Sequence, residues 1–135
     1  MVDSFHGFSL IELMVVVAIV AILGAVAYPS YQQFLLTGQR VDAKTMLLHA
    51  ADRQESYFMD FNRYATTVGE LNISAVSKSG HYLLAVSATT NTFSLVASAT
   101  GSQVADTTCT RFSIDQDGIK SAKNSANSAS DDCWD

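Results

Sequence analysis

The sequence predicts an α+β protein in which one long N-terminal helix, with a membrane-spanning first half, packs on a four-stranded antiparallel sheet. Three observations predict this fold. An apolar run opens the chain, an amphipathic pattern at helical spacing follows it, and four short alternating segments separated by turn signals come last. A chain of 135 residues has room for one modest domain and an appendage.

The apolar run extends from Phe8 to Tyr28 and is interrupted only by Ser9 and Glu12. A helix needs about 20 apolar residues to cross a bilayer core, so the run is long enough. A buried helix of a soluble protein is one alternative, although so small a chain can hardly enclose a helix that is apolar all round. A cleaved secretory signal peptide is another, although its apolar run is shorter and its start is basic, whereas residues 1–7 contain no Lys or Arg.

Glu12 is an unusual residue to find near the start of this run. A carboxylate inside a membrane costs roughly 2.5–3.5 kcal/mol at a helix centre and less near the interface. Ionisable groups in membranes usually pair with another group, and the first Lys or Arg of the chain is Arg40. The partner of Glu12 must therefore belong to another chain or be created after synthesis.

A family resemblance lies in residues 7–34, GFSLIELMVVVAIVAILGAVAYPSYQQF, which resemble the type IV pilins and their secretion-system relatives, the pseudopilins. The match joins a Gly-Phe junction, a Glu shortly after it, an unbroken apolar run and a Pro at the far end. The resemblance implies a pilin fold in three parts. These are a prepilin leader at 1–7, the transmembrane and filament-core half of the helix at 8–28, and a periplasmic or extracellular globular domain at 29–135.

The resemblance also implies a route of processing and assembly. A prepilin peptidase would cut between Gly7 and Phe8 and methylate the new amino group of Phe8. In a filament, this ammonium would meet Glu12 of a neighbouring subunit, which would neutralise the carboxylate and fix the axial offset of the two helices. Leaders of this family usually carry Lys or Arg, whereas this one has Asp3 and His6. Membrane orientation would then rely on the N-terminal amine and His6, or on a longer basic leader.

Two residues weaken the helix near the end of the apolar run. Pro29 lacks a backbone donor and clashes with the preceding turn, and Gly24 lowers helix propensity. These residues should kink or locally melt the helix. The resemblance implies that the segment from Gly24 to Pro29 is unwound in the filament, which would let the fibre stretch.

An amphipathic pattern follows Pro29, with apolar residues at helical spacing and Gln54 as an interruption. The apolar positions are Leu36, Ala43, Leu47, Ala50, Phe58 and Phe61. We expect one continuous helix from about residue 8 to about residue 61, with its second half forming a wall of the domain. The aromatic residues near its end are interpreted as core: Tyr57, Phe58, Phe61 and Tyr64.

Four strands are expected, at about 81–89, 92–99, 109–115 and 119–122. Before them, Thr67-x-x-Glu70 has capping-box spacing and predicts a short helical turn over 68–71. Asp117-Gly118 is the strongest turn signal in the chain. Asp115-x-Asp117-Gly118 is also compatible with calcium, but a hairpin is favoured because no further carboxylates lie in register.

Cys109 and Cys133 are the only cysteines. An exported domain meets an oxidising compartment, so a disulfide is expected, with two free thiols or a metal pair as alternatives. The bridge would anchor the polar tail KNSANSASDD, which has almost nothing to bury. With this closed C-terminal loop, the whole chain resembles type IV pilins, and its ending resembles their small minor pilins.

No catalytic set, zinc spacing or phosphate loop is visible, so neither an enzyme nor a cofactor is expected. The resemblance implies a structural subunit, a minor pilin, of a type IV pilus used for twitching motility, adhesion or DNA uptake. Its partners would be other pilin subunits, a prepilin peptidase and an inner-membrane assembly platform. It would cross the inner membrane once with a cytoplasmic N-terminus, and enter the extracellular pilus on assembly.

Three alternatives remain: a type II secretion pseudopilin, a major pilin and a DNA-receptor pilin. Major pseudopilins tend to lack the disulfide and to bind calcium. A DNA receptor predicts a basic stripe near the disulfide loop, whereas Lys120 and Lys123 are accompanied by several aspartates. The net charge of −5 also disfavours nucleic acid as a partner.

Overall fold

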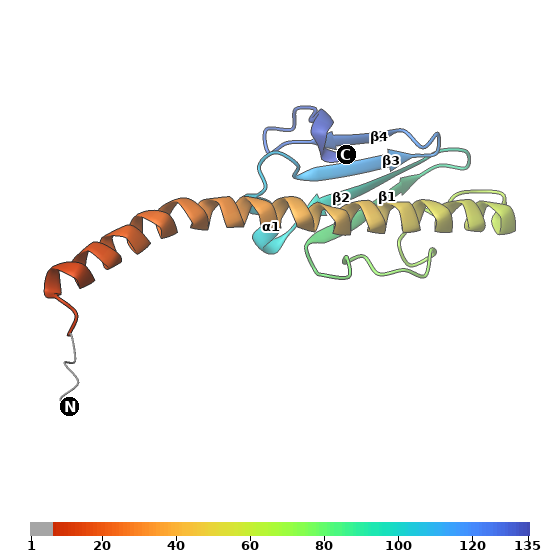
Figure 1. The fold of residues 1–135 in the computed structure, drawn as a ribbon. Helices are drawn as coiled ribbons and strands as arrows, with labels where there is room; N and C mark the ends of the chain where they lie inside the picture. The colour runs from red at the N-terminus through yellow and green to blue at the C-terminus, as the bar shows by residue number, and fades with distance from the viewer. Residues whose placement is uncertain (1–6) are drawn as a thin grey trace. The chain divides into compact units, whose positions relative to one another are not determined.

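The computed structural model describes residues 7–135, and its elements follow the predicted order (Figure 1). Helix α1 is Leu10–Phe61, and the strands are β1 (Tyr82–Ala88), β2 (Phe93–Ala99), β3 (Arg111–Asp115) and β4 (Lys120–Lys123). Two short 3-10 helices, η1 (Gly101–Ala105) and η2 (Asp131–Cys133), lie in the connections. The single long helix and the four strands are confirmed, with strand ends that differ from the prediction by at most two residues.

The chain divides into two compact units, residues 1–35 and 36–135. Every buried residue of the described chain lies in the second unit, which therefore holds the whole core. All described residues of the first unit are exposed. The expected boundary between residues 28 and 29 marks the end of the membrane-spanning segment, which is a different property from compactness. It stays a prediction.

The sheet is an antiparallel meander with the strand order β1-β2-β3-β4. Side chains of one parity are buried along the strands, among them Tyr82, Leu95 and Phe112, as the alternation predicts. They pack on the second half of α1 to form the core. The opposite face of the sheet carries mostly small side chains on β1 and β2 and is open to solvent.

The second half of α1 buries one stripe of side chains: Ala43, Leu47, Ala50 and Gln54. Gln54 does not interrupt this stripe, contrary to the expectation from the sequence. Its amide donates to the carbonyl of Ala65 at 2.9 Å and accepts from the Ala65 N–H at 2.8 Å. Because both polar ends are hydrogen-bonded, the amide can be buried without leaving a donor or acceptor unsatisfied. Gln54 thereby ties the helix to the segment that follows it.

The prediction that Phe61 lies in the core is wrong. Its side chain is 60% exposed, because the helix ends there and the ring lies against Tyr57, with centroids 4.4 Å apart. Tyr57 is itself only partly buried. Tyr64 does join the core, where it packs edge-on against Phe93 at 4.8 Å, and Phe58 packs against the same cluster.

Thr67 and Glu70 form the predicted capping box. The Thr67 N–H donates to the Glu70 carboxylate, and the Glu70 N–H donates to the Thr67 hydroxyl, each at 3.3 Å. The segment 68–71 is nevertheless a hydrogen-bonded turn and not the expected helical turn. The turn ends at Asn72, whose φ of 52° cannot continue a right-handed helix.

Glu70 also joins this turn to the end of α1. Its carboxylate accepts from the Arg63 guanidinium at 2.8 Å and from the Thr66 N–H at 2.7 Å. These bonds, that to Arg63 first, lower the pKa of Glu70 from 4.5 to about 2. The folded state therefore stabilises the charged form of Glu70 relative to its protonated form.

Glu70→Gln should destabilise the chain at neutral pH and have a smaller effect in acid. Since the folded-state pKa lies below the ordinary value, the stabilisation is present above about pH 4.5 and is lost as the pH falls towards about 2. Denaturant unfolding of both full-length chains in micelles, at about pH 7 and about pH 2.5, measures the difference. A gap between the two curves that is equally wide at both pH values would mean that the charge is not responsible.

The hairpin between β3 and β4 uses the acidic turn as predicted. The Asp115 carboxylate accepts the N–H groups of Asp117 and Ile119 at 3.0 and 2.9 Å. Gly118 has a φ of 74°, which favours glycine at this position. The Asp115 carboxylate thus serves the backbone of the turn.

Cys109 and Cys133 form the predicted disulfide, with Cα atoms 5.7 Å apart, and both are buried. Beyond it, Trp134 packs edge-on against Phe112 at 5.8 Å and donates to the Ser121 carbonyl at 2.9 Å. The bridge therefore holds an aromatic side chain against the core at the end of an otherwise polar tail.

Candidate functional site

The expected processing and assembly residues lie at the start of the described chain. Gly7 and Phe8 precede α1, and Glu12 lies in its first turn. The other leader residues, 1–6, lie outside the described part. Phe8 is 83% exposed, which leaves the Gly-Phe junction accessible. A carboxylate in a first helical turn also interacts favourably with the positive end of the helix dipole.

Glu12 has no ionic partner among the described residues. The ion pairs found within residues 7–135 are Arg40–Asp106 and Arg63–Glu70, both much later in the chain. A carboxylate without a partner is costly among lipid-facing side chains. A single chain, as far as it is described, therefore leaves the need for a counter-charge unmet.

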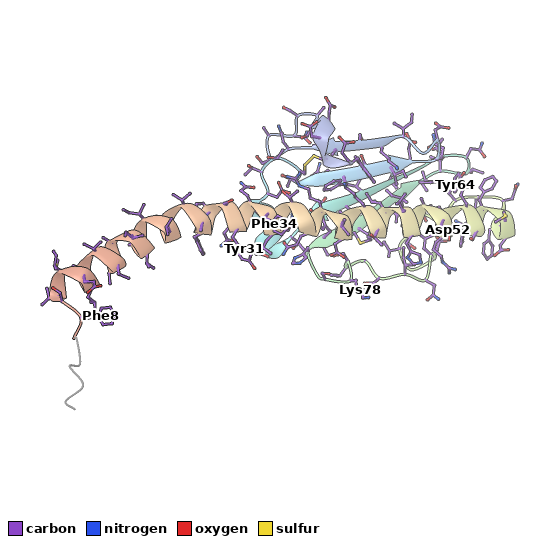
Figure 2. All side chains as sticks on the ribbon, in the orientation of Figure 1. Phe8, Tyr31, Phe34, Asp52, Tyr64 and Lys78 are labelled. Carbon is purple, nitrogen blue, oxygen red and sulfur yellow. A yellow bond between two sulfur atoms is a disulfide. The ribbon has the colours of Figure 1, made fainter. Side chains whose placement is uncertain are left out.

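The first part of α1 presents apolar side chains on all sides. It contains a window of 18 residues with a mean hydropathy of 2.8, none of which is buried. Tyr31 and Phe34 continue the exposed surface (Figure 2), at 60% and 74% exposure. The helix is long and apolar enough to cross a membrane, and nothing in the described chain covers it, so the alternative of a core helix within this chain does not fit.

The segment around Gly24 and Pro29 is helical in the single chain. Pro29 removes one backbone donor, and no residue of this segment is buried, so no packing against the core supports its helix. The side chain of Gln32 donates to the Tyr28 hydroxyl at 2.9 Å across the proline. The expected unwinding concerns the filament and stays a prediction.

A second candidate site emerges from the basic residues. Five of the eight Lys and Arg side chains have internal contacts: Arg40 with Asp106, Lys44 with the Asp135 carbonyl, Arg53 with the Leu71 carbonyl, Arg63 with Glu70, and Lys120 over the Trp134 ring. The other three make no side-chain hydrogen bond or ion pair within residues 7–135: Lys78, Arg111 and Lys123.

Arg111 and Lys123 lie directly opposite each other on β3 and β4. Both are exposed on the outer face of the sheet, beside Ser113 and Ser121, whose hydroxyls lie 2.7 Å apart. Like charges in directly opposed positions destabilise a strand pair. The arrangement therefore lowers stability unless an anion binds between the two side chains.

A hollow of about 270 Å³ adjoins this pair and is lined by Thr110, Arg111, Asn124, Ser125 and Asn127. The Asn124 side chain fixes the loop by accepting the N–H groups of Ala126 and Ser128, each at 3.0 Å. Every lining side chain can donate a hydrogen bond. The hollow and the cation pair together suit a phosphate group.

Asp115, one of the aspartates near Lys120 and Lys123 in the sequence, does not lie opposite Lys123. Arg111 is opposite Lys123, whereas Asp115 lies at the other end of β3, about 13 Å along the strand. This separation exceeds the screening length of about 10 Å at 0.1 M salt. Asp131 and Asp132 do remain in the disulfide loop, so the basic surface is confined to the cation pair and the hollow.

Lys78 is the third basic residue without such a partner, and it lies on a different surface. Its side chain extends from the segment before β1 (Figure 2). It lines two open hollows of about 510 and 370 Å³, which residues of α1 and of that segment border. Asp42 and Thr45 of α1 line both hollows as well. The nearby carboxylate makes this surface less favourable for an anion than the outer face of the sheet.

Two family models match the chain. Residues 29–113 match a model described as "Type IV minor pilin ComP, DNA uptake sequence receptor", and residues 3–28 match the prokaryotic N-terminal methylation motif. The first match covers more than half of the chain and includes β1, β2 and most of β3. The second covers Gly7, Phe8 and Glu12.

Similar proteins are found among curated sequences and solved structures. The type IV major pilin PilA of Myxococcus xanthus is 39% identical over 62% of this chain and 37% of its own length. A probable minor fimbrial protein of Dichelobacter nodosus is 38% identical over 49% of this chain and 40% of its own length. The chain thus spans about two fifths of these relatives. A type IV pilin structure from Shewanella oneidensis shares the fold, with a TM-score of 0.51 and 24% identity over 63% of this chain and 89% of that one.

Proposed function

Because the chain belongs to the family described as type IV minor pilin ComP, DNA uptake sequence receptor, we propose that it is a type IV pilus subunit that binds DNA. The observation that carries the DNA-binding part is the exposed pair of Arg111 and Lys123, opposed across two strands without an acidic partner among the described residues. Of the three roles expected for the pilus, the family description favours DNA uptake. It also favours the DNA-receptor alternative that composition disfavoured.

The N-terminal part of the proposal follows the methylation motif at residues 3–28. A prepilin peptidase cuts after Gly7 and methylates Phe8, and the new ammonium pairs with Glu12 of a neighbouring subunit. Before assembly the chain crosses the inner membrane once, with its N-terminus in the cytoplasm. An assembly platform in that membrane then transfers it into the extracellular filament.

Double-stranded DNA fits the outer face of the sheet better than a single strand does. Cations that contact phosphates bind duplex DNA regardless of sequence, whereas single-strand binders also present aromatic rings on which bases stack. Within the described chain, the nearby ring of Trp134 is engaged by Phe112 and Lys120. The surface therefore offers phosphate contacts and hydroxyl groups, with no free ring beside them.

Replacing Arg111 and Lys123 together with alanine should weaken DNA binding and flatten its salt dependence. Each lost phosphate contact lowers the slope of log affinity against log salt by about 1, so the double variant should lose about 2. Fluorescence anisotropy of a labelled duplex with the full chain in micelles, between about 50 and about 200 mM salt, measures both effects.

Lys78→Ala is the matched control, since it removes one cation from the surface beside α1. It should leave the salt slope unchanged. Equal losses of DNA affinity in the double variant and in Lys78→Ala would mean that DNA contacts another surface or responds only to the net charge of the chain. Failure of the wild-type chain to bind duplex DNA would contradict the receptor role. It would not bear on the role as pilus subunit, which incorporation into filaments tests separately.

A further inference from the structure

Helix α1 changes from a bare helix to a packed one between Leu35 and Ala43. Every described residue up to Leu35 is exposed, and the buried stripe starts at Ala43. Between them lies Gly38, a residue that weakens helices. A Cβ at this position would meet no atom of another part of the protein within 4 Å, so close packing does not explain the glycine. This interval is therefore a second weak point of α1, after Gly24 and Pro29.

A buried polar cluster holds α1 on either side of Gly38. The Gln103 amide donates to the Leu36 carbonyl at 3.0 Å, one residue into the second compact unit. The Arg40 guanidinium binds both carboxylate oxygens of Asp106, at 2.6 and 2.9 Å. Gln103 is fully buried and Asp106 is 2% exposed. The cluster thus contacts α1 two residues before the glycine and two residues after it.

The other side of the cluster is anchored at the disulfide and at Thr110, the residue before β3. The Asp106 carboxylate also accepts the Cys109 N–H at 3.2 Å, and its carbonyl accepts the Thr110 hydroxyl at 3.2 Å. Gln103 donates to the same carboxylate at 3.3 Å. Cys109 is bonded to Cys133, so the side chains that hydrogen-bond to α1, those of Gln103 and Asp106, are held next to a covalently closed part of the domain.

We propose that Gln103 and Asp106 form a clamp that keeps α1 helical from Leu36 onward when the segment before it unwinds in a filament. This role rests on the proposed function, since that unwinding is expected only in a pilus. Without the clamp, unwinding that starts between Gly24 and Pro29 would pass Gly38 and reach the first buried residue, Ala43. The clamp therefore sets the end of the extensible segment.

Hydrogen exchange of the full chain in micelles tests the clamp without requiring a filament. Asp106→Asn should speed exchange of the amides at 37–43 by about tenfold or more, and leave those of 51–58 and of β2 unchanged. Glu70→Gln is the matched control, because it breaks an ion pair at the other end of the helix. It should leave exchange at 37–43 as in the wild type.

Two further variants keep the outcome clear if Asp106→Asn unfolds the domain. Gln103→Leu removes only the bond to Leu36 and the bond to Asp106, and should also speed exchange at 37–43. Gly38→Ala, added to either variant, should restore slow exchange there. Unchanged exchange at 37–43 in Gln103→Leu, or no recovery with Gly38→Ala, would overturn the clamp. These results come from single chains, so they stand apart from any failure in filament assembly or DNA binding.

Discussion

Glu12→Ala should leave the chain inserted in the membrane and nearly abolish its incorporation into filaments. Insertion does not suffer, because the substitution removes a carboxylate that costs up to roughly 3 kcal/mol in lipid. Assembly suffers, because the Phe8 ammonium of the neighbouring subunit would be buried without its counter-charge. Removing one partner of a buried ion pair costs about 3–5 kcal/mol, which corresponds to a loss of roughly 100-fold or more in the assembly equilibrium.

The measurement compares two fractions from cells that produce the variant. Immunoblots of the membrane fraction report insertion, and immunoblots of sheared filaments report incorporation. Glu12→Gln keeps the size and removes the charge, so it should behave as Glu12→Ala does. Ser9→Ala, which changes a neutral polar residue immediately before α1, should assemble normally. Wild-type levels of Glu12→Ala in the filaments would refute the charge pairing.

Glu12 has no counter-charge among the described residues. Glu12 lies in the first turn of a helix whose described residues up to Leu35 are all exposed. No Lys or Arg precedes Arg40, and Arg40 is bound to Asp106. The leader residues 1–6, including His6, lie outside the described part, and the proposed cut removes them. A counter-charge for Glu12 is therefore expected from the new N-terminus of another subunit.

The sequence predicted the elements of the fold well because each has a strong periodic pattern. Alternation placed Tyr82, Leu95 and Phe112 on the buried face, and helical spacing placed Ala43 and Leu47 in the core. Errors arose where burial depends on the path of the chain beyond the element. Gln54 is buried because Ala65 returns to bond its amide, and Phe61 is exposed because the helix ends there.

The candidate site was only half visible in the sequence. The expected processing and assembly residues Gly7, Phe8 and Glu12 lie in one contiguous motif, so the sequence alone is enough to predict them. The pair of Arg111 and Lys123 depends on strand register, which sets which side chains are opposite each other and cannot be read from composition. Net charge does not report on the pair for the same reason, since it sums over acids such as Asp115 that lie well away from the pair.

Replacing Cys109 and Cys133 together with serine should lower the free energy of unfolding by about 3 kcal/mol. The sequence separation of 24 residues sets the loop whose closure entropy the bridge removes from the unfolded chain. The tail that follows β4 is mostly polar, and its main apolar contact with the core beyond the bridge itself is Trp134 against Phe112. Without the covalent link, the tail is held by this ring contact and a few hydrogen bonds, among them that from Lys44 to the Asp135 carbonyl, so we expect the Trp134 contact to be lost as well.

Two measurements follow the loss of the disulfide: one reports the stability of the domain, and the other reports release of the tail. Denaturant unfolding of the full chain in micelles gives the change in free energy, and Trp134 fluorescence, from the only tryptophan, reports release of the tail. Duplex binding should weaken too, because Asn124, Ser125 and Asn127 of the hollow beside Arg111 lie inside the loop. Trp134→Phe is the control that keeps the bridge and an aromatic contact, and it should retain most of the stability and the DNA affinity. A serine variant that unfolds like the wild type while losing DNA affinity would mean that the bridge shapes the binding loop without stabilising the fold.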